Sequence, residues 1–180
     1  MGQEPKTGRE TDASVQQTLQ QLSLRLQRLE AIDAIKQLKA RYLMACDTKQ
    51  PEQMRDCFLD GDIVIDYGPV GRFSHRDQLV DTFIEFGCHP YMLEMHHGHN
   101  PIIDITSNAS AQGSWELFYQ LINTKNKTIT QLAIIYYDQY RCIDGEWKII
   151  ETVTKNVSTM VLDIADETPR IVTASAPPQQ

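Results

Sequence analysis

The chain has 180 residues, of which 41% are hydrophobic, and a net charge of −7 at pH 7. This length suits one domain with a sizeable core and is short for two. The negative charge and the absence of a Lys/Arg-rich run argue against nucleic-acid binding. No apolar stretch approaches the roughly 20 residues that a membrane helix needs. We therefore expect one globular domain that binds neither nucleic acid nor membrane.

The cysteines and the two ends of the chain predict its setting and its domain limits. Four cysteines are scattered without a CxxC pair, and the N-terminal segment lacks the apolar core of a secretory signal. Both features are typical of a reduced, cytoplasmic protein. Residues 1–14 are polar and predict a mobile tail, and residues 161–180 predict a second tail. The domain itself is predicted over residues 15–160.

The first predicted element is a helix that begins near Val15 and continues to Cys46. Its first part, residues 15–30, carries leucines spaced by three and four residues, namely Leu19, Leu22, Leu26 and Leu29. Such a narrow stripe is typical of a helix that packs on another helix. Two interpretations stay open: a contact with a neighbouring subunit, and a lid packed on the chain's own domain.

Shorter elements follow this helix. A proline in the first turn predicts a short helix over Pro51–Phe58, and β-branched residues predict a strand over Ile63–Tyr67. Another helix is predicted over His75–Phe86, with Ser74 as its N-cap.

The rest of the chain predicts long strands. They cover Tyr91–Ile105, Ser110–Ile122, Thr128–Cys142 and a run from Trp147, which follows an Asp144-Gly145 hairpin turn. Helices followed by strands indicate an α+β fold, in which N-terminal helices pack against one face of a curved, mixed or antiparallel sheet to form a cone. A binding site is then expected inside the cone.

The strand over Thr128–Cys142 is apolar on both faces. Ile129, Ala133, Ile135 and Tyr137 fall on one face, and Leu132, Ile134 and Tyr136 fall on the other. The outer face therefore needs cover, which predicts a homo-oligomer, with a dimer favoured over a trimer.

Four stretches of the sequence carry a family resemblance. They are Arg41–Asp47 with a Tyr-x4-Asp pattern, Phe58–Asp62 before the first strand, His96–Ile105 followed by Ala111-x-Gly113-x-Trp115, and Tyr140–Ile149 in the closing hairpin. In this order and spacing the chain resembles the SnoaL-like family of polyketide cyclases and small dehydratases or isomerases. That family is part of the nuclear transport factor 2-like superfamily, whose fold is also called cystatin-like. The resemblance covers about residues 30–155 and implies a cone-shaped fold.

The resemblance also implies a site. In scytalone dehydratase and bile-acid 7α-dehydratase, a Tyr, an Asp and a His line the cone and remove water without metal or nucleotide. The matching positions here are Tyr42, Asp47 and His96, so no cofactor is expected. The bile-acid enzyme has a further acidic residue on the strand after the histidine. The position here that corresponds to it lies at or near Tyr119, which is not acidic.

These residue types suit elimination of water from a β-hydroxy carbonyl compound. Histidine exchanges protons near neutrality, a carboxylate bonded to it fixes its tautomer, and a phenol can donate to the developing enolate oxygen. The residues also have simpler interpretations. His96 suits an inert strand histidine or a metal ligand with His97 or His99, although a regular strand places His96 and His97 on opposite faces.

Asp47 and Tyr42 also have simpler interpretations, as a helix-terminal residue bonded to backbone and as a core tyrosine. They lie about 140° apart on a regular helix. Both can face the cavity only if the helix ends or loosens near residues 45–47.

Further residues are predicted to line the pocket, with plain core packing as the alternative for each: Tyr67, Phe83, Met95, His99 as a reserve histidine, Trp115 and Tyr119. The favoured function is a cofactor-independent dehydratase or isomerase acting on a hydrophobic, hydroxylated carbonyl compound of polycyclic, steroid-like or aromatic type. The alternatives are a non-catalytic small-molecule-binding module and a scaffold that assembles through the Leu19–Leu29 helix.

Overall fold

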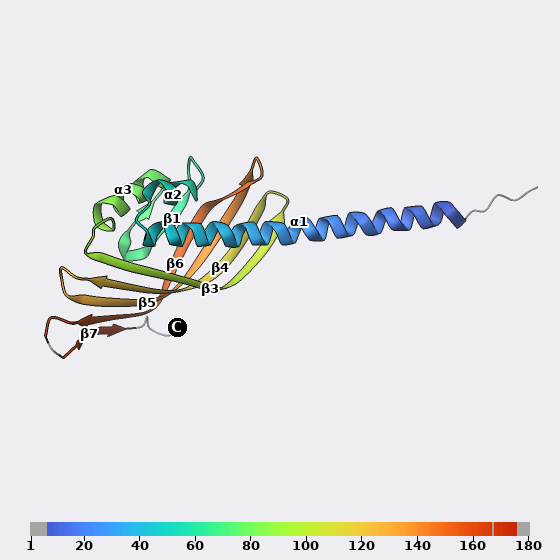
Figure 1. The fold of residues 1–180 in the computed structure, drawn as a ribbon. Helices are drawn as coiled ribbons and strands as arrows, with labels where there is room; N and C mark the ends of the chain where they lie inside the picture. The colour runs from blue at the N-terminus through green and yellow to red at the C-terminus, as the bar shows by residue number, and fades with distance from the viewer. Residues whose placement is uncertain (1–6, 167, 176–180) are drawn as a thin grey trace, which may run out of the picture.

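One long helix, α1 (Thr7–Asp47), dominates the computed structural model, which describes residues 7–166 and 168–175 (Figure 1). Its N-terminal half projects away from the rest of the chain, and residues 12–30 are all exposed. From Ala31 onward α1 lies against the sheet. The predicted tail over residues 1–14 is thus corrected for residues 7–14, which are helical, while residues 1–6 lie outside the described residues.

The strands form one curved, unclosed sheet. They are β1 (Val64–Asp66), β2 (Arg72–Phe73), β3 (Met92–Ser107), β4 (Ser110–Asn123), β5 (Thr128–Ile143), β6 (Glu146–Asp163) and β7 (Arg170–Ser175). The order is β2-β1-β6-β5-β4-β3, and β7 pairs with β6. All pairs are antiparallel except β1 with β6, so the sheet is mixed.

The short helices α2 (Pro51–Asp56), η1 (Gly68–Val70) and α3 (Arg76–Phe86) lie on the same side of the sheet as α1 (Figure 1). This arrangement confirms the predicted α+β class with helices packed on one face of a curved sheet. None of the described helices has the length and apolar character needed to cross a membrane. The cap of α3 differs from the prediction, because the His75 side chain, and not Ser74, accepts the Asp77 backbone N–H at 3.2 Å.

The two ends of β6 show one confirmed and one wrong prediction. Asp144 and Gly145 have φ of 51° and 84°, as expected for the predicted two-residue hairpin turn before β6. The predicted tail over residues 161–180 is wrong in its first part. β6 continues to Asp163, and β7 returns along it with Thr159 paired to Ser175 and Asp163 paired to Arg170.

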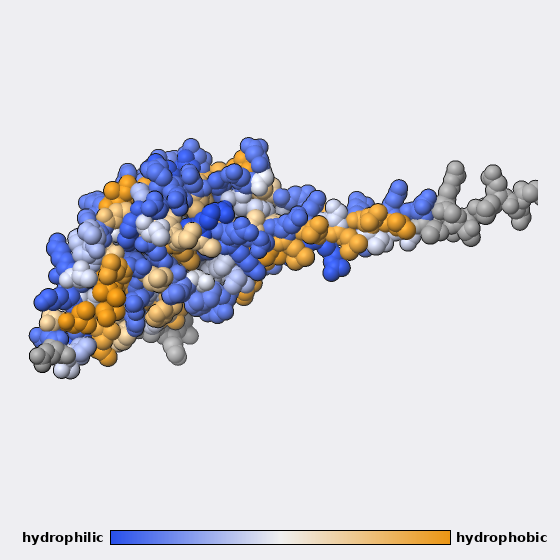
Figure 2. All heavy atoms as spheres, in the orientation of Figure 1, coloured by the Kyte–Doolittle hydropathy of each residue, from blue (hydrophilic) through white to orange (hydrophobic). Residues whose placement is uncertain are grey.

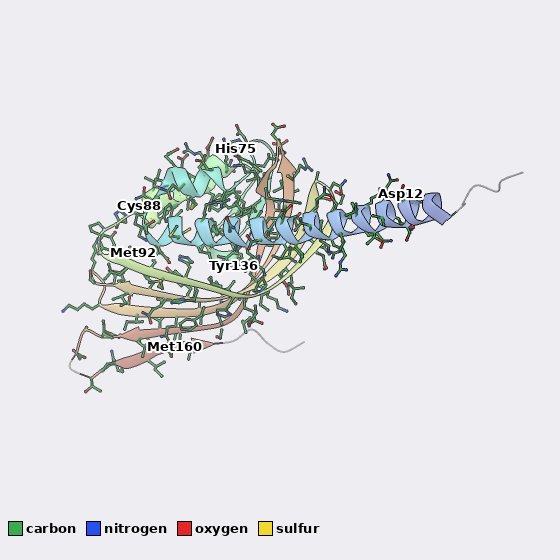
Figure 3. The ribbon with its side chains drawn as sticks, turned by 45° about the vertical axis from the view of Figure 1, so that its right-hand side comes forward. Asp12, His75, Cys88, Met92, Tyr136 and Met160 are labelled. Carbon is green, nitrogen blue, oxygen red and sulfur yellow. The ribbon has the colours of Figure 1, made fainter. Side chains whose placement is uncertain are left out.

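A buried ion pair joins α1 to β5. Lys39 Nζ lies 2.8 Å from Asp138 Oδ2, and the two side chains are 1% and 0% exposed. The Tyr140 hydroxyl donates to the same carboxylate oxygen at 2.7 Å, and the Trp115 indole N–H donates to Tyr140 at 2.9 Å. The Lys39 ammonium also lies 3.6 Å from the ring centroid of Tyr136, which Figure 3 shows between α1 and the sheet. Burial lowers the pKa of Lys39, and the charge of Asp138 opposes this shift.

We expect the single substitution Lys39→Met to lower the free energy of unfolding by about 3–5 kcal/mol, because Asp138 would remain as an uncompensated buried charge. The double variant Lys39→Met/Asp138→Leu should lose less than the single variant. Urea unfolding measures both. Arg72→Met is the control, since Arg72 pairs with Asp66 while 82% exposed, and its loss should cost less than about 1 kcal/mol. A double variant no more stable than Lys39→Met would contradict this account.

Candidate functional site

A cavity of about 570 Å³ lies between the concave face of the sheet, the end of α1 and α3. Most of its wall is apolar, with side chains from α2, η1, α3 and the strands that include Met54, Val70, Phe83, Phe86, Leu117, Leu132 and Ile134. Met92, at the start of β3, also lines it (Figure 3). The volume falls within the usual range for small-molecule sites. Polar side chains reach this space in three groups.

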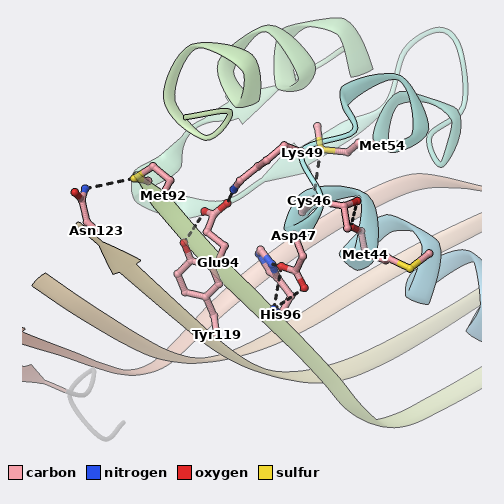
Figure 4. A network of polar contacts seen from close by, with 11 residues as sticks. Met44, Cys46, Asp47, Lys49, Met54, Met92, Glu94, His96, Tyr119 and Asn123 are labelled. Atoms are coloured by element: carbon pink, nitrogen blue, oxygen red, sulfur yellow. Dashed lines mark hydrogen bonds and ion pairs between the residues drawn. The ribbon is translucent and has the colours of Figure 1, made fainter. Parts of the chain in front are cut away.

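The first group is a carboxylate–imidazole pair. The carboxylate Oδ1 of Asp47 lies 2.6 Å from His96 Nδ1, and both of its oxygens lie 3.1 Å from the backbone nitrogen of His96 (Figure 4). The two side chains are 16% and 14% exposed. His96 lines the cavity, and Asp47 lies beside it. Since Asp47 accepts at Nδ1, the ring holds its proton there and leaves Nε2 as the basic nitrogen.

Two local features bring these residues together. Gly98 on β3 leaves room for the Leu43 side chain of α1, since a Cβ there would lie 2.6 Å from Leu43 Cδ1. α1 then ends at Asp47, and Lys49 adopts φ of 56°, a left-handed cap conformation that is uncommon outside glycine and asparagine. From the sequence, Tyr42 and Asp47 were expected to face one cavity only if the helix ended or loosened near residues 45–47. The observed end of α1 at Asp47 meets this condition.

The second group is a pair of phenols. The hydroxyls of Tyr42 and Tyr67 are 2.8 Å apart, and both residues line the cavity. The Tyr42 ring packs edge-on against Phe58, and the Tyr67 ring packs edge-on against Tyr136. Burial raises the pKa of both phenols well above the ordinary value. The pair is therefore neutral and able to donate hydrogen bonds.

The third group was not predicted from the sequence. Glu94 lines the cavity, forms an ion pair with Lys49 and accepts a hydrogen bond from the Tyr119 hydroxyl at 2.7 Å (Figure 4). The Tyr119 ring in turn lies 4.7 Å, between centroids, from the His96 ring. Glu94 thus places a carboxylate beside Tyr119, at or near the position that corresponds to the further acidic residue of the bile-acid enzyme. Its separation of two from His96 along a strand is the signal that could have found it.

The structure separates the predicted pocket residues into two sets. Tyr67, Phe83 and Tyr119 line the cavity. Three others do not. Met95 is 47% exposed, on the face of β3 opposite His96. His99 is exposed beside Glu116, before a register shift in β3 that begins after it. Trp115 is buried against Tyr140. Strand periodicity excludes Met95 from the cavity wall. Side chains alternate between the two faces of β3, so a wall residue must lie an even number of positions from His96.

His97 is exposed and points to the outer face, as the alternation along the strand predicts. Within residues 7–166 and 168–175, no group of three His, Cys, Asp or Glu side chains is arranged to hold a metal ion.

Comparison with known proteins identifies the family. Residues 27–153 match the family described as the SnoaL-like domain. The chain belongs to this family. Its structural neighbours include a protein of Novosphingobium aromaticivorans DSM 12444 proposed to be a scytalone dehydratase, with 22% identity and a TM-score of 0.68 over 81% of this chain and 95% of that one.

Two further structural neighbours are informative. The hexachlorocyclohexane dehydrochlorinase LinA-type3 of Novosphingobium barchaimii LL02 is 19% identical, with a TM-score of 0.64 over 86% of this chain and 99% of that one. A cystatin-like protein of unknown function from Nostoc punctiforme PCC 73102 is 21% identical, with a TM-score of 0.55 over 68% and 87%. At these identities the likeness shows the fold. The neighbours thus include proteins named for elimination reactions and one with no assigned activity.

The buried phenols give a test by alkaline titration. Burial raises the pKa of Tyr42, Tyr67, Tyr119, Tyr136 and Tyr140, five of the seven tyrosines. A raised pKa means that these phenols stay protonated in the folded protein above the ordinary range near pH 10. The absorbance at about 295 nm, near pH 11, should therefore show only a minor fraction of the phenolate that appears in guanidinium at the same pH. Equal signals from the folded and unfolded protein would contradict the buried placement.

Proposed function

We propose that this SnoaL-like protein is a cofactor-independent lyase or isomerase that removes a proton next to a carbonyl group. The observation that carries the proposal is the 2.6 Å contact between Asp47 and His96 at the wall of a largely apolar cavity. A carboxylate at Nδ1 orients the imidazole and stabilises the imidazolium that forms when Nε2 takes a proton. In an apolar surrounding this stabilisation is stronger than in water.

The Tyr42–Tyr67 pair supports the enolate step. When a C–H bond next to a carbonyl breaks, negative charge moves to the carbonyl oxygen. A neutral phenol that is already oriented by a second phenol can donate to that oxygen without first being desolvated. In this proposal Tyr42 and Tyr67 form the oxyanion site, and His96 is the base.

Elimination is completed by the same imidazole. His96 Nε2 takes the proton from carbon, the electrons of that C–H bond form the C=C bond, and the C–O bond to the β-hydroxyl breaks. The departing oxygen receives the proton from Nε2 and leaves as water, so that His96 returns to its starting state. In an isomerase the proton would return instead to another carbon of the same compound.

The cavity supports a substrate class. Its apolar wall favours a polycyclic, steroid-like or aromatic skeleton, and its volume of about 570 Å³ suits a molecule of that size. Glu94 adds a fixed acceptor, which suits a hydroxyl group on the substrate. A hydrophobic, hydroxylated carbonyl compound matches these features together.

We expect His96→Gln to lower turnover of a panel of β-hydroxy ketones and thioesters by about 10²–10⁴-fold, because the general base is lost. The appearance of the conjugated product is followed by ultraviolet absorbance. His97→Gln is the matched control, since His97 is next in sequence on β3 and faces outward. Unchanged turnover in His96→Gln would end the role of His96 as base.

Glu94→Gln tests the proposed hydroxyl acceptor. We expect the Kd of a hydroxylated ligand to rise about tenfold, as for a lost hydrogen bond to a charged group, and that of its deoxy analogue to stay the same. Isothermal titration measures both. Glu116→Gln on the outer face of β4 is the control, since Glu116 is 56% exposed and lies outside the cavity. Equal losses for both ligands would contradict the assignment.

The apolar wall also favours a second function, non-catalytic binding of a small apolar ligand in the same cavity. Exchange of ketone α-protons with D2O, followed by NMR, distinguishes the two. A bound ketone that exchanges in the wild type and not in His96→Gln supports the lyase or isomerase. A bound ketone that never exchanges supports the binding module.

A further inference from the structure

The projecting part of α1 carries an apolar seam that is exposed along its whole length. The seam consists of Val15, Leu19, Leu22, Leu26 and Leu29, each 52–63% exposed. Figure 2 shows hydrophobic side chains gathered along this part of α1. Exposed leucines in a row are costly in water, and a helix without tertiary contacts is only marginally stable there. We therefore expect the seam to be covered by another apolar surface.

The chain's own domain cannot provide that surface. The seam lies on the same continuous helix that packs on the sheet from Ala31 onward. Residues 12–50 contain neither glycine nor proline, the residues at which helices usually kink. A fold back onto the sheet would require α1 to break, so the seam is directed toward another molecule. This excludes the lid interpretation.

The spacing and charges of the seam identify the partner. Spacings of four, three, four and three place the five residues at the d, a, d, a and d positions of three successive heptads. Arg25 then occupies a g position and Glu30 the e position of the next heptad. In a parallel coiled coil a g residue meets the following e residue of the other helix, so two copies would bring Arg25 to Glu30 twice, once on each side.

The ends of the seam agree with this assignment. The next a and d positions are Asp33 and Lys36, which are charged and exposed, and the preceding a position is Asp12. The apolar pattern thus stops where α1 reaches its own domain. From these observations we propose that residues 15–30 of α1 form a parallel, in-register coiled coil with the same segment of a second copy of this chain.

The first test is the mass in solution. Sedimentation velocity of the full chain should give an assembly of at least twice 20.6 kDa, and Leu22→Ser/Leu26→Ser should lose it and sediment as a single chain. Leu24→Ser is the matched control, because Leu24 is equally exposed, at 55%, and lies outside the seam at an f position. It should keep the assembly. A monomeric wild type, or a double variant that keeps its mass, would overturn the proposal.

The second test concerns orientation. In a parallel, in-register pair Leu29 meets Leu29 of the partner copy, whereas an antiparallel pair centred on Leu22 brings it next to Val15. Leu29→Cys should therefore form a disulfide-linked dimer under a mild oxidant on a non-reducing gel. Leu24→Cys controls for the native cysteines and for random collision. Absence of a link from Leu29→Cys, or an equal link from Leu24→Cys, would overturn the parallel arrangement.

The third test concerns the charges. Arg25→Glu should weaken the assembly several-fold, because two Glu–Glu contacts replace two Arg–Glu contacts. Arg25→Glu/Glu30→Arg restores opposite charges and should recover the wild-type dissociation constant. A double variant as weak as Arg25→Glu would overturn the proposed pairing of these two positions.

Discussion

The position of α1 on the sheet depends on the buried contact between Lys39 and Asp138. Transfer of two charges from water into a protein interior is unfavourable, so the pair adds little net stability unless its geometry is good. Its effect is on geometry. Lys39, Tyr42 and Cys46 share one helix face at spacings of three and four, and the last two line the cavity. Because Lys39 must meet Asp138, the helix can neither rotate nor slide, and the Tyr42 hydroxyl is held toward Tyr67.

The end of α1 shows a conflict between local preference and the site. The C-terminus of a helix carries partial negative charge, which disfavours a carboxylate such as that of Asp47. The backbone N–H and the ring of His96 compensate for this. Lys49 is held in a left-handed conformation that costs a non-glycine residue about 1–2 kcal/mol. Its side chain pairs with Glu94. Local strain of this kind is common where a site fixes its geometry.

Much of the fold could be predicted because it follows from short-range patterns. Strand alternation separates His96 from His97, the Asp144-Gly145 pair defines a hairpin, and the absence of glycine and proline from residues 9–50 permits the length of α1. Contacts that join distant residues left no such pattern. Lys39 and Asp138 are 99 positions apart, and although each shares a face with apolar residues, nothing in the sequence shows that the two side chains meet. The segment that forms β7 contains the β-branched residues Ile171, Val172 and Thr173, but it is only six residues long and lies close to a Pro177-Pro178 pair that is typical of a tail.

The candidate site, like the fold, could be predicted where a sequence pattern marks its residues and not where it depends on how strands pair. The family pattern points to Tyr42, Asp47 and His96, and the structure brings the last two into direct contact. Glu94 was overlooked because its interaction with Tyr119 depends on how β3 pairs with β4. Met95 and Trp115 are apolar and lie close to wall residues along their strands. Hydrophobicity alone cannot tell which face of a strand, or which end of it, borders a cavity.

The register shift after His99 has a consequence for how the sheet can change next to the site. β3 is the outermost strand of its side of the sheet, so its far edge has no strand that must match it. Pro101, which cannot donate a backbone hydrogen bond, and Asn100, with φ of 51°, are tolerated there because no second ladder is broken. Insertions or deletions in this border strand would shift His99 and the residues beyond it while leaving β4, β5 and β6 paired. Related proteins can thus diverge at this margin without rebuilding their core.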